Sequence, residues 1–354
     1  MKVLFTCADK PTISRNLFHR NYLKKHYDTI ECVSEGKSYA SRIPSVLFCL
    51  LKKMWSADIF FVGYMGHFLV VFLRLFTKKP IIFDFYLSIY DVMCNDRKIY
   101  TPNSLAGRFT YWIEKRSLEL ADFVIVDTDK LIETLSKEYG VNKEKFVRVP
   151  LTINEKNVKP VDVKKYSENF SVLYVGSYIP LHGTPLIIEA ARLAQENGEK
   201  ISFLMIGKGP DFETCYNLAQ KYNLTNIEFK GFMPLEELNY YYNACDVNLG
   251  LFNTGERANS VILNKTNDAF RVGKPHVTLN TDAMSEAFKD EEDIFFVPEN
   301  TPKSLFETLL KIKNNPTLLE KVGQNALKTY EKKLSNASAE KIVTEKIFQK
   351  IIKE

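Results

Sequence analysis

The sequence lacks several patterns that would indicate a particular class of protein. Its six cysteines are scattered and include no C-x-x-C pair, which argues against a zinc site or a disulfide framework and predicts reduced, mostly buried thiols. No apolar run reaches transmembrane length, and the N-terminal MKVLFTCADK has too short an apolar run for a signal peptide. Walker loops, H-E-x-x-H motifs and low-complexity tracts are also missing. We therefore expect a globular, cytoplasmic protein.

Length and charge narrow the possibilities further. At 354 residues the chain exceeds the size at which one hydrophobic core keeps growing, so we expect two domains. The net charge of +5 is a mild excess of basic residues and does not indicate a nucleic-acid partner.

Short apolar runs alternate with helical patterns along the chain. Strands are predicted at 2–6, 28–33, 58–63, 80–84, 122–127 and 146–149. A stretch with little periodicity, 154–170, reads as a linker, and six strands follow it: SVLYVG, ISFLMIG, IEFKGFM, DVNLGLF, HVTLN and IFFVP. This alternation predicts an α/β fold with two doubly wound, Rossmann-like domains facing across a cleft, at 1–160 and 170–338. A last helix, about 339–354, can return to the first domain.

The turn after the first strand of the second domain has the features of an anion site. Gly176 and Gly183 allow the backbone to approach a ligand, while Thr184 and Pro185 suit the N-cap and first position of a helix. Free N–H groups and the dipole at a helix N-terminus favour an anion such as phosphate. An ordinary strand–turn–helix connection has the same pattern, so this turn needs support from elsewhere in the chain.

A second polar loop, TGERANSVILNKTNDAFRVGKPHVTLN at 254–280, supplies that support. Asn264 is suited to cap a helix that ends at Gly273, and Arg257 and Lys265 place cations near its start. Two helix N-termini and several cations in one crevice suit a diphosphate, and Asp268 suits sugar hydroxyls. Taken singly, these residues also fit a solvated helix face or a partner of the helix dipole.

These motifs resemble the GT-B glycosyltransferases, specifically glycosyltransferase family 4 with its group 1 domain. VGSYIPLHGTPLIIEAA resembles the family's Gly-rich turn, IGKGP its G-x-G-P turn, and NKTNDAFRVGKPHVT its helix and following strand. The resemblance implies retaining transfer of a hexosyl-type sugar from a UDP- or GDP-type nucleotide-sugar, without a catalytic metal or cofactor. It also implies a saccharide or lipid-linked acceptor, as in cell-surface polysaccharide or glycoconjugate synthesis.

The chain departs from the family pattern at two charged pairs. The family's Arg and Lys of the first turn fall at Ser177 and His182, so diphosphate neutralisation is expected to depend on Arg257 and Lys265. The family's two glutamates fall at Ser260 and Asp268, which leaves open whether Glu256 replaces the first.

The predicted site residues come from strand ends in both halves of the chain. Four are expected to be catalytic: His67, Asp91, Arg257 and Lys265. Donor binding is assigned to Gly176, Ser177, His182, Gly183, Gly207, Gly209, Gly231, Glu256, Asn264, Thr266 and Asp268. The acceptor side is assigned to Gly66, Asp84, Ser88, Arg97 and Asp127.

Two stretches of the first domain combine apolar and basic residues, IPSVLFCLLKKMW at 43–55 and GHFLVVFLRLFTKKP at 66–80. They fit core helices with solvated ends, and they equally fit helices on an anionic membrane surface. The rival functions are a GT-B nucleotide-sugar epimerase and a two-domain protein that binds a small ligand without turnover.

Overall fold

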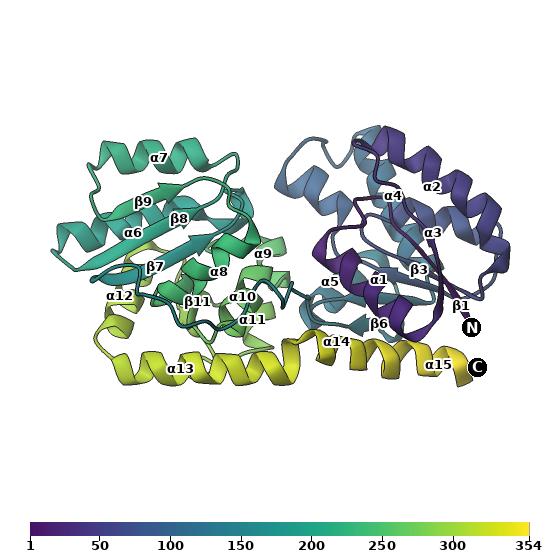
Figure 1. Ribbon diagram of the computed structural model, residues 1–354. Coiled ribbons are helices and arrows are strands. Elements are labelled where there is room, and N and C mark those ends of the chain that lie inside the picture. The colour runs from purple at the N-terminus through teal and green to yellow at the C-terminus, as the bar shows by residue number, and fades with distance from the viewer. Residues whose placement is uncertain (354) are drawn as a thin grey trace. The chain divides into compact units, whose positions relative to one another are not determined.

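The computed structural model describes residues 1–353, apart from the side chains of Tyr39, Ala40 and Asp96. It forms two compact units, drawn in Figure 1. Unit 1 contains Met1–Thr152 and the segment that begins at Asn336, and unit 2 contains Ile153–Ser335. Within the described residues, no helix combines the length and the hydropathy needed to cross a bilayer.

Unit 1 is built on six parallel strands in the order β2-β1-β3-β4-β5-β6. The strands are β1 (Lys2–Thr6), β2 (Asp28–Cys32), β3 (Ile59–Val62), β4 (Ile81–Asp84), β5 (Phe123–Val126) and β6 (Phe146–Arg148). The helices are α1 (Ser14–His26), α2 (Tyr39–Lys53), α3 (His67–Arg74), α4 (Leu105–Leu120), α5 (Asp129–Tyr139), α14 (Asn336–Val343) and α15 (Gln349–Lys353). Each strand lies within one residue of its predicted range, because buried parallel strands are short, continuous apolar runs.

Helices cover both faces of this sheet. One apolar core joins the sheet to side chains of α2, α3, α4 and α5, among them Leu50, Leu69, Leu118 and Leu135. The opposite core joins the sheet to α1 and to the C-terminal segment. The sheet is therefore buried on both sides, and its carboxyl-terminal edge is left to loops.

The C-terminal segment is an integral part of unit 1. Val343 and Phe348 are fully buried in the core on the α1 side. The Phe348 ring stacks on Tyr27 at 4.4 Å, and the hydroxyl groups of Tyr22 and Thr344 lie 2.8 Å apart. The chain thus leaves unit 1, forms unit 2 and returns to complete the core of unit 1.

Unit 2 repeats the architecture with six parallel strands in the order β12-β11-β10-β7-β8-β9. The strands are β7 (Phe170–Val175), β8 (Ile201–Ile206), β9 (Ile227–Lys230), β10 (Val247–Leu249), β11 (His276–Leu279) and β12 (Phe295–Val297). The helices are α6 (Thr184–Glu196), α7 (Phe212–Lys221), α8 (Leu235–Ala244), α9 (Glu256–Ser260), α10 (Asn264–Arg271), α11 (Asp282–Ser285), α12 (Pro302–Lys313) and α13 (Pro316–Thr329). The predicted doubly wound fold is confirmed in both units.

The stretch predicted as a linker, 154–170, is instead attached to unit 2. The backbone N–H of Lys159 donates to Asn239 Oδ1 at 2.9 Å, and that of Val161 donates to Asn243 Oδ1 at 3.0 Å. Both acceptors lie on α8. Sequence periodicity misses this contact because side chains of a distant helix hold the irregular backbone.

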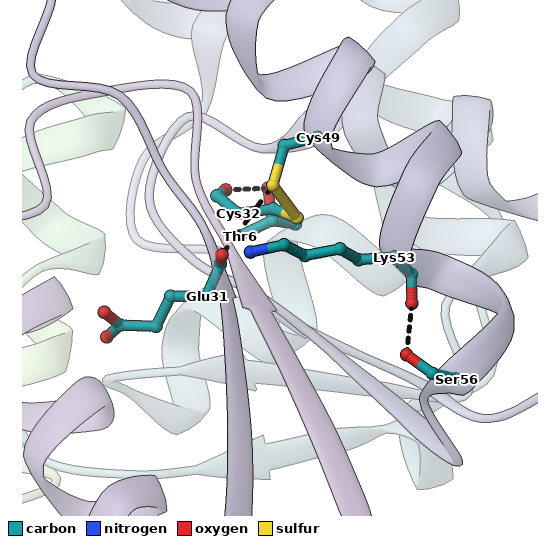
Figure 2. The surroundings of a disulfide bond; sticks show 6 residues. All are labelled: Thr6, Glu31, Cys32, Cys49, Lys53 and Ser56. Carbon is teal, nitrogen blue, oxygen red and sulfur yellow. Dashed lines mark hydrogen bonds between the residues drawn. A yellow bond between two sulfur atoms is a disulfide. The ribbon is translucent and has the colours of Figure 1, made fainter.

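A disulfide between Cys32 and Cys49 contradicts the prediction that all six thiols are reduced. Figure 2 shows that it joins the end of β2 to α2, with Thr6, Glu31 and Lys53 around it. The Thr6 hydroxyl donates to the Cys32 carbonyl at 2.8 Å. The two cysteines lie 17 residues apart and form no recognisable sequence motif. The bond could not be predicted from the sequence, because only the fold brings the two cysteines together. Cys7, Cys94, Cys215 and Cys245 are free and buried.

We predict that four of the six cysteines react with a thiol reagent when the protein is unfolded without reductant, and all six after reduction. Cys49→Ser should cost roughly 3 kcal/mol of unit 1 stability, because the bond restricts the unfolded chain. Denaturation followed by tryptophan fluorescence measures this, since both tryptophans, Trp55 and Trp112, lie in unit 1. Six reactive thiols in the unreduced protein would refute the assignment.

Candidate functional site

The first turn of unit 2 runs from the end of β7 to the start of α6. Its N-cap is Gly183, in a left-handed conformation with φ 62°, and Thr184 is the first helical residue and fully buried. The predicted cap at Thr184 is therefore wrong by one position. Any Cβ at Gly183 would overlap the carbonyl of Phe252, so the turn is pressed against the loop after β10. Only glycine fits there.

A tyrosine on β7 positions the histidine of this turn. The Tyr174 hydroxyl lies 2.8 Å from His182 Nδ1 and 3.1 Å from the Ser177 carbonyl, to which it donates. Burial, aided by the nearby charge of Lys265, holds the pKa of His182 well below its ordinary value. His182 is consequently neutral and orders the turn, while the side chain of Ser177 is exposed.

Lys265 on α10 brings a cation to the same turn. It is only 7% exposed, its Nζ has no hydrogen-bond partner among the described residues, and it lies 4.1 Å from the centre of the Tyr174 ring. A Cβ built on Gly176 would lie 2.9 Å from that Nζ, so the ammonium faces the Gly176 backbone. Burial lowers the pKa of Lys265 to about 7, opposed by the charge of Asp268. A buried, unpartnered ammonium is poised to accept an anionic ligand.

The rest of α10 is buried beside this lysine. Asp268 is 8% exposed, accepts a hydrogen bond from the Tyr242 hydroxyl at 3.1 Å, and has a pKa raised by burial. Thr266 Oγ1 lies 3.1 Å from His276 Nε2. The N-cap of α10 is Leu263 with no side-chain cap, so the predicted capping role of Asn264 is wrong. Asn264 is instead the first helical residue, and its Oδ1 is buried without a partner among the described residues.

The other glycine turns lie at neighbouring strand ends. Gly207 has φ 138°, and a Cβ there would overlap the carbonyl of Gly176. A Cβ on Gly209 would collide with the backbone of Tyr178, whereas Gly231 is exposed and faces open space apart from Lys208. Gly207 and Gly209 therefore bring the loop after β8 against the first turn.

The short α9 carries the remaining predicted donor-side charges. Arg257 is half-buried, and its charge helps to lower the pKa of His182, which indicates that it acts on the first turn. Glu256 is exposed, and the buried Ser260 donates its hydroxyl to the Glu256 carbonyl at 2.9 Å. Ser260, which stands at the family's first glutamate position, thus makes a hydrogen bond within its own helix.

In unit 1, the strand-end residues separate into two buried clusters. Asp84, at the end of β4, is 1% exposed and forms an ion pair with Arg15 at 2.9 Å. His19 Nε2 lies 3.1 Å from the other oxygen of the Asp84 carboxylate. Arg15 also donates to the Pro150 carbonyl at 3.1 Å. This arrangement joins β4 to α1 and to the end of the unit 1 chain segment.

The second cluster is centred on Glu114, which sequence reasoning missed because it lies in the middle of α4. Its carboxylate accepts hydrogen bonds from the Ser88 hydroxyl at 2.6 Å, the Tyr139 hydroxyl at 2.8 Å and the Tyr90 N–H at 3.1 Å. Glu114 is fully buried, and burial raises its pKa to about 7. The cluster fixes the loop that follows β4.

His67 borders this cluster at the start of α3. Its Nε2 lies 3.9 Å from Glu114, it is 2% exposed, and Gly66 is the N-cap before it. Burial lowers the pKa of His67 to about 3, so the imidazole is neutral. Phe83 and Phe85 pack edge-on against its ring.

Asp91, predicted as catalytic, and the acceptor-side residues Arg97 and Asp127 are more accessible. The backbone N–H of Asp91 donates to the Ser88 hydroxyl at 2.9 Å, and its carboxylate accepts from Asn95 at 3.1 Å. Arg97 is exposed, and Asp127 is half-buried at the end of β5. The described residues contain no group of three or more side chains suited to hold a metal ion.

Replacing Asp84 tests its structural role. We predict that Asp84→Asn lowers unit 1 stability by about 3 kcal/mol, because it leaves the Arg15 guanidinium buried without its counter-charge. The matched control is Asp129→Asn, which removes the exposed partner of an ion pair with the half-buried Arg148 and should cost under about 1 kcal/mol. Denaturation followed by tryptophan fluorescence compares the two variants, and equal stabilities would contradict the stabilising role of the buried pair between Asp84 and Arg15.

Comparisons with known proteins show what the chain is similar to. Residues 155–329 match the family model described as Glycosyl transferases group 1. The uncharacterized glycosyltransferase MJ1069 of Methanocaldococcus jannaschii is 24% identical over 299 residues, which cover 83% of this chain and 74% of the relative. MJ1178 of the same organism is 26% identical over 46% of this chain, and the match spans only 43% of that relative.

Two solved structures share the fold across the whole chain. Sucrose-phosphate synthase from Thermosynechococcus elongatus has a TM-score of 0.77 at 15% identity, with 100% of both chains covered. HepE of Anabaena, solved in complex with UDP, has a TM-score of 0.72 at 13% identity, with 99% of this chain and 100% of that chain covered. Both six-stranded units thus have the GT-B architecture, and residues 155–329, which make up nearly all of unit 2, match the group 1 glycosyltransferase family.

Proposed function

We propose that the protein is a retaining glycosyltransferase that moves a hexosyl-type sugar from a UDP- or GDP-type nucleotide-sugar to a saccharide or lipid-linked acceptor. The observation that carries the proposal is the buried, unpartnered ammonium of Lys265, which faces Gly176 at the turn before α6. The UDP bound by HepE supports a nucleoside diphosphate as the ligand. Synthesis of a cell-surface polysaccharide or glycoconjugate is the setting that we propose.

The donor would bind with its diphosphate between Lys265 and the N-terminus of α6. In group 1 enzymes the first turn itself supplies Arg and Lys, whereas here Ser177 is neutral and His182 is held neutral. The positive charge would therefore come from α10, and from Arg257 on α9. The Asp268 carboxyl group would accept or donate hydrogen bonds to hydroxyl groups of the nucleotide-sugar.

The chemistry requires charge stabilisation on the departing diphosphate and alignment of the acceptor. In a retaining reaction of this type, the leaving phosphate oxygen takes the acceptor proton on the face from which it leaves. Lys265 and Arg257 would stabilise that oxygen electrostatically, with no need for a metal or other cofactor. On the acceptor side, the loop held by Glu114 would present Asp91, with neutral His67 beside it as a positioning residue.

A lipid-linked acceptor would place the enzyme at a membrane surface, and we propose peripheral association through unit 1. The outer side of α2 and the turn after it expose Phe48, Leu51 and Trp55. The stretch 66–80 contributes less, because α3 buries His67, Leu69, Val70 and Leu73. Only Leu75 and Phe76, at its end, are exposed large apolar residues.

Nucleoside diphosphate binding tests the donor site. We predict that UDP or GDP raises the melting temperature of the wild type, because a ligand that binds only the folded state stabilises it. Lys265→Met should fold normally yet bind 10- to 100-fold more weakly, since a charge-assisted hydrogen bond contributes about 1.5–3 kcal/mol. Lys303→Met, at a lysine side chain that is 78% exposed, is the matched control.

Product analysis then separates transfer from its rivals. Incubation with nucleotide-sugars should release free nucleotide only when an acceptor extract is present, and Lys265→Met should lose roughly 2 to 4 kcal/mol of transition-state stabilisation. An epimerised nucleotide-sugar formed without acceptor, or binding without any turnover, would replace the proposal with the corresponding rival. If neither nucleotide binds, the donor site itself is refuted.

The lowered pKa of Lys265 predicts a pH dependence of binding. Its ammonium loses its proton as the pH rises through about 7, and a bound diphosphate favours the charged form. Affinity should therefore fall as the pH rises from about 7 to 9, with proton uptake on binding at the upper end. Calorimetry in buffers of different ionisation enthalpy measures both effects. Lys265→Met should show neither, and an equally steep profile in that variant would contradict the assignment.

A further inference from the structure

The outer face of α4 exposes large apolar side chains where a soluble helix usually carries polar ones. Leu105, Phe109 and Trp112 are 88%, 60% and 48% exposed. Their spacing of four and three residues places them on one side of the helix, and the rings of Phe109 and Trp112 stack at 5.9 Å. We call this set the α4 face.

The inner side of the same helix is packed into unit 1. Ile113 and Leu118 are buried, and so is Glu114, which holds Ser88 and Tyr90 of the loop after β4. The α4 face is therefore a second apolar stripe that the fold of unit 1 does not need. Exposed apolar stripes of this kind mark interaction surfaces.

The charges around the α4 face indicate the kind of partner. Five cations lie between residues 97 and 116, namely Arg97, Lys98, Arg108, Lys115 and Arg116. Within this range the only acidic residue is Glu114, which is fully buried, and Glu119 on the next turn of α4 pairs with Lys115 and Arg116, so that the face keeps an excess of basic residues. A second copy docked through the same face would bring like charges together, whereas an anionic bilayer accommodates both the cations and the apolar side chains.

We propose that the α4 face docks on the surface of an anionic lipid bilayer. The inference rests on the proposed function in one respect, because docking brings the loop after β4 close to the lipid, where a lipid-linked acceptor would be found. One helix presents Glu114 inward to Ser88 and Tyr90, and Phe109 and Trp112 outward. Docking thus holds the carboxyl-terminal edge of the unit 1 sheet at the membrane, within reach of a lipid-linked acceptor.

Vesicle flotation tests the docking directly. The wild type should float with vesicles of phosphatidylcholine containing about a third phosphatidylglycerol, float far less with pure phosphatidylcholine, and be released as salt rises. Leu105→Asp and Phe109→Asp should each reduce binding at least tenfold. Arg108→Glu should also reduce vesicle binding. Each basic charge removed near an anionic surface costs about 1 kcal/mol, which is a reduction in affinity of about fivefold or more.

The matched control is Ile352→Asp, at an exposed isoleucine of α15 on the opposite side of the unit 1 sheet. It should bind vesicles as the wild type does. Transfer to a water-soluble acceptor should be unchanged in Leu105→Asp, so that failure of docking and failure of the proposed activity are distinguished.

The two tryptophans allow the docking face to be identified. In Trp55→Phe the remaining Trp112 reports on α4, and in Trp112→Phe the remaining Trp55 reports on the turn after α2. We expect Trp112 emission to shift to shorter wavelength on anionic vesicles and to be quenched by brominated lipid. No flotation, binding in which Trp112 stays unquenched, or a dimer that Leu105→Asp dissociates would each overturn the proposal.

Discussion

The position of one buried ammonium group organises the candidate donor site. Lys265 lies against the Tyr174 ring and the Gly176 backbone, and Tyr174 in turn positions His182. Removing a charge from water without a hydrogen-bond partner costs free energy, and this cost shows in the lowered pKa of the lysine. An anion bound there would give the ammonium group a partner. Binding would therefore offset the free-energy cost of keeping the Lys265 charge buried in the free protein. Glycines at 183 and 207 are required because a Cβ there would overlap the backbone carbonyls of Phe252 and Gly176, whereas a Cβ at Gly176 would meet the Lys265 ammonium group.

The proposed donor site takes its positive charge from a different element than the family pattern does. The first turn carries Ser177 and a neutral His182, so it supplies no cation of its own. Lys265 of α10 brings one to the turn instead. The replacement differs physically from an exposed Arg or Lys, since its charge depends on pH near neutrality. Arg257, whose charge also acts on His182, adds a permanent cation to the same region.

The sequence predicted all twelve strands, because most of them are short, buried apolar runs bounded by turn residues, and only the edge strands β2 and β9 are more exposed. It was less successful with contacts between distant segments. Glu114 gave no signal, since a single acidic residue inside an amphipathic helix usually faces solvent. The Cys32–Cys49 bond and the attachment of 154–170 to α8 likewise depend on neighbours in space. The predicted caps at Thr184 and Asn264 were each wrong by one position, because the helices begin at these residues and Gly183 and Leu263 are the N-caps.

The return of the chain to unit 1 has a consequence for biosynthesis. Unit 2 is continuous in sequence, whereas the core on the α1 side of unit 1 needs Val343 and Phe348. During translation, unit 2 can therefore fold as soon as it leaves the ribosome, while one apolar face of the earlier-made sheet of unit 1 is covered by α1 alone. Order of synthesis and order of completion are reversed, which makes unit 1 the part of the nascent protein that most needs protection by a chaperone.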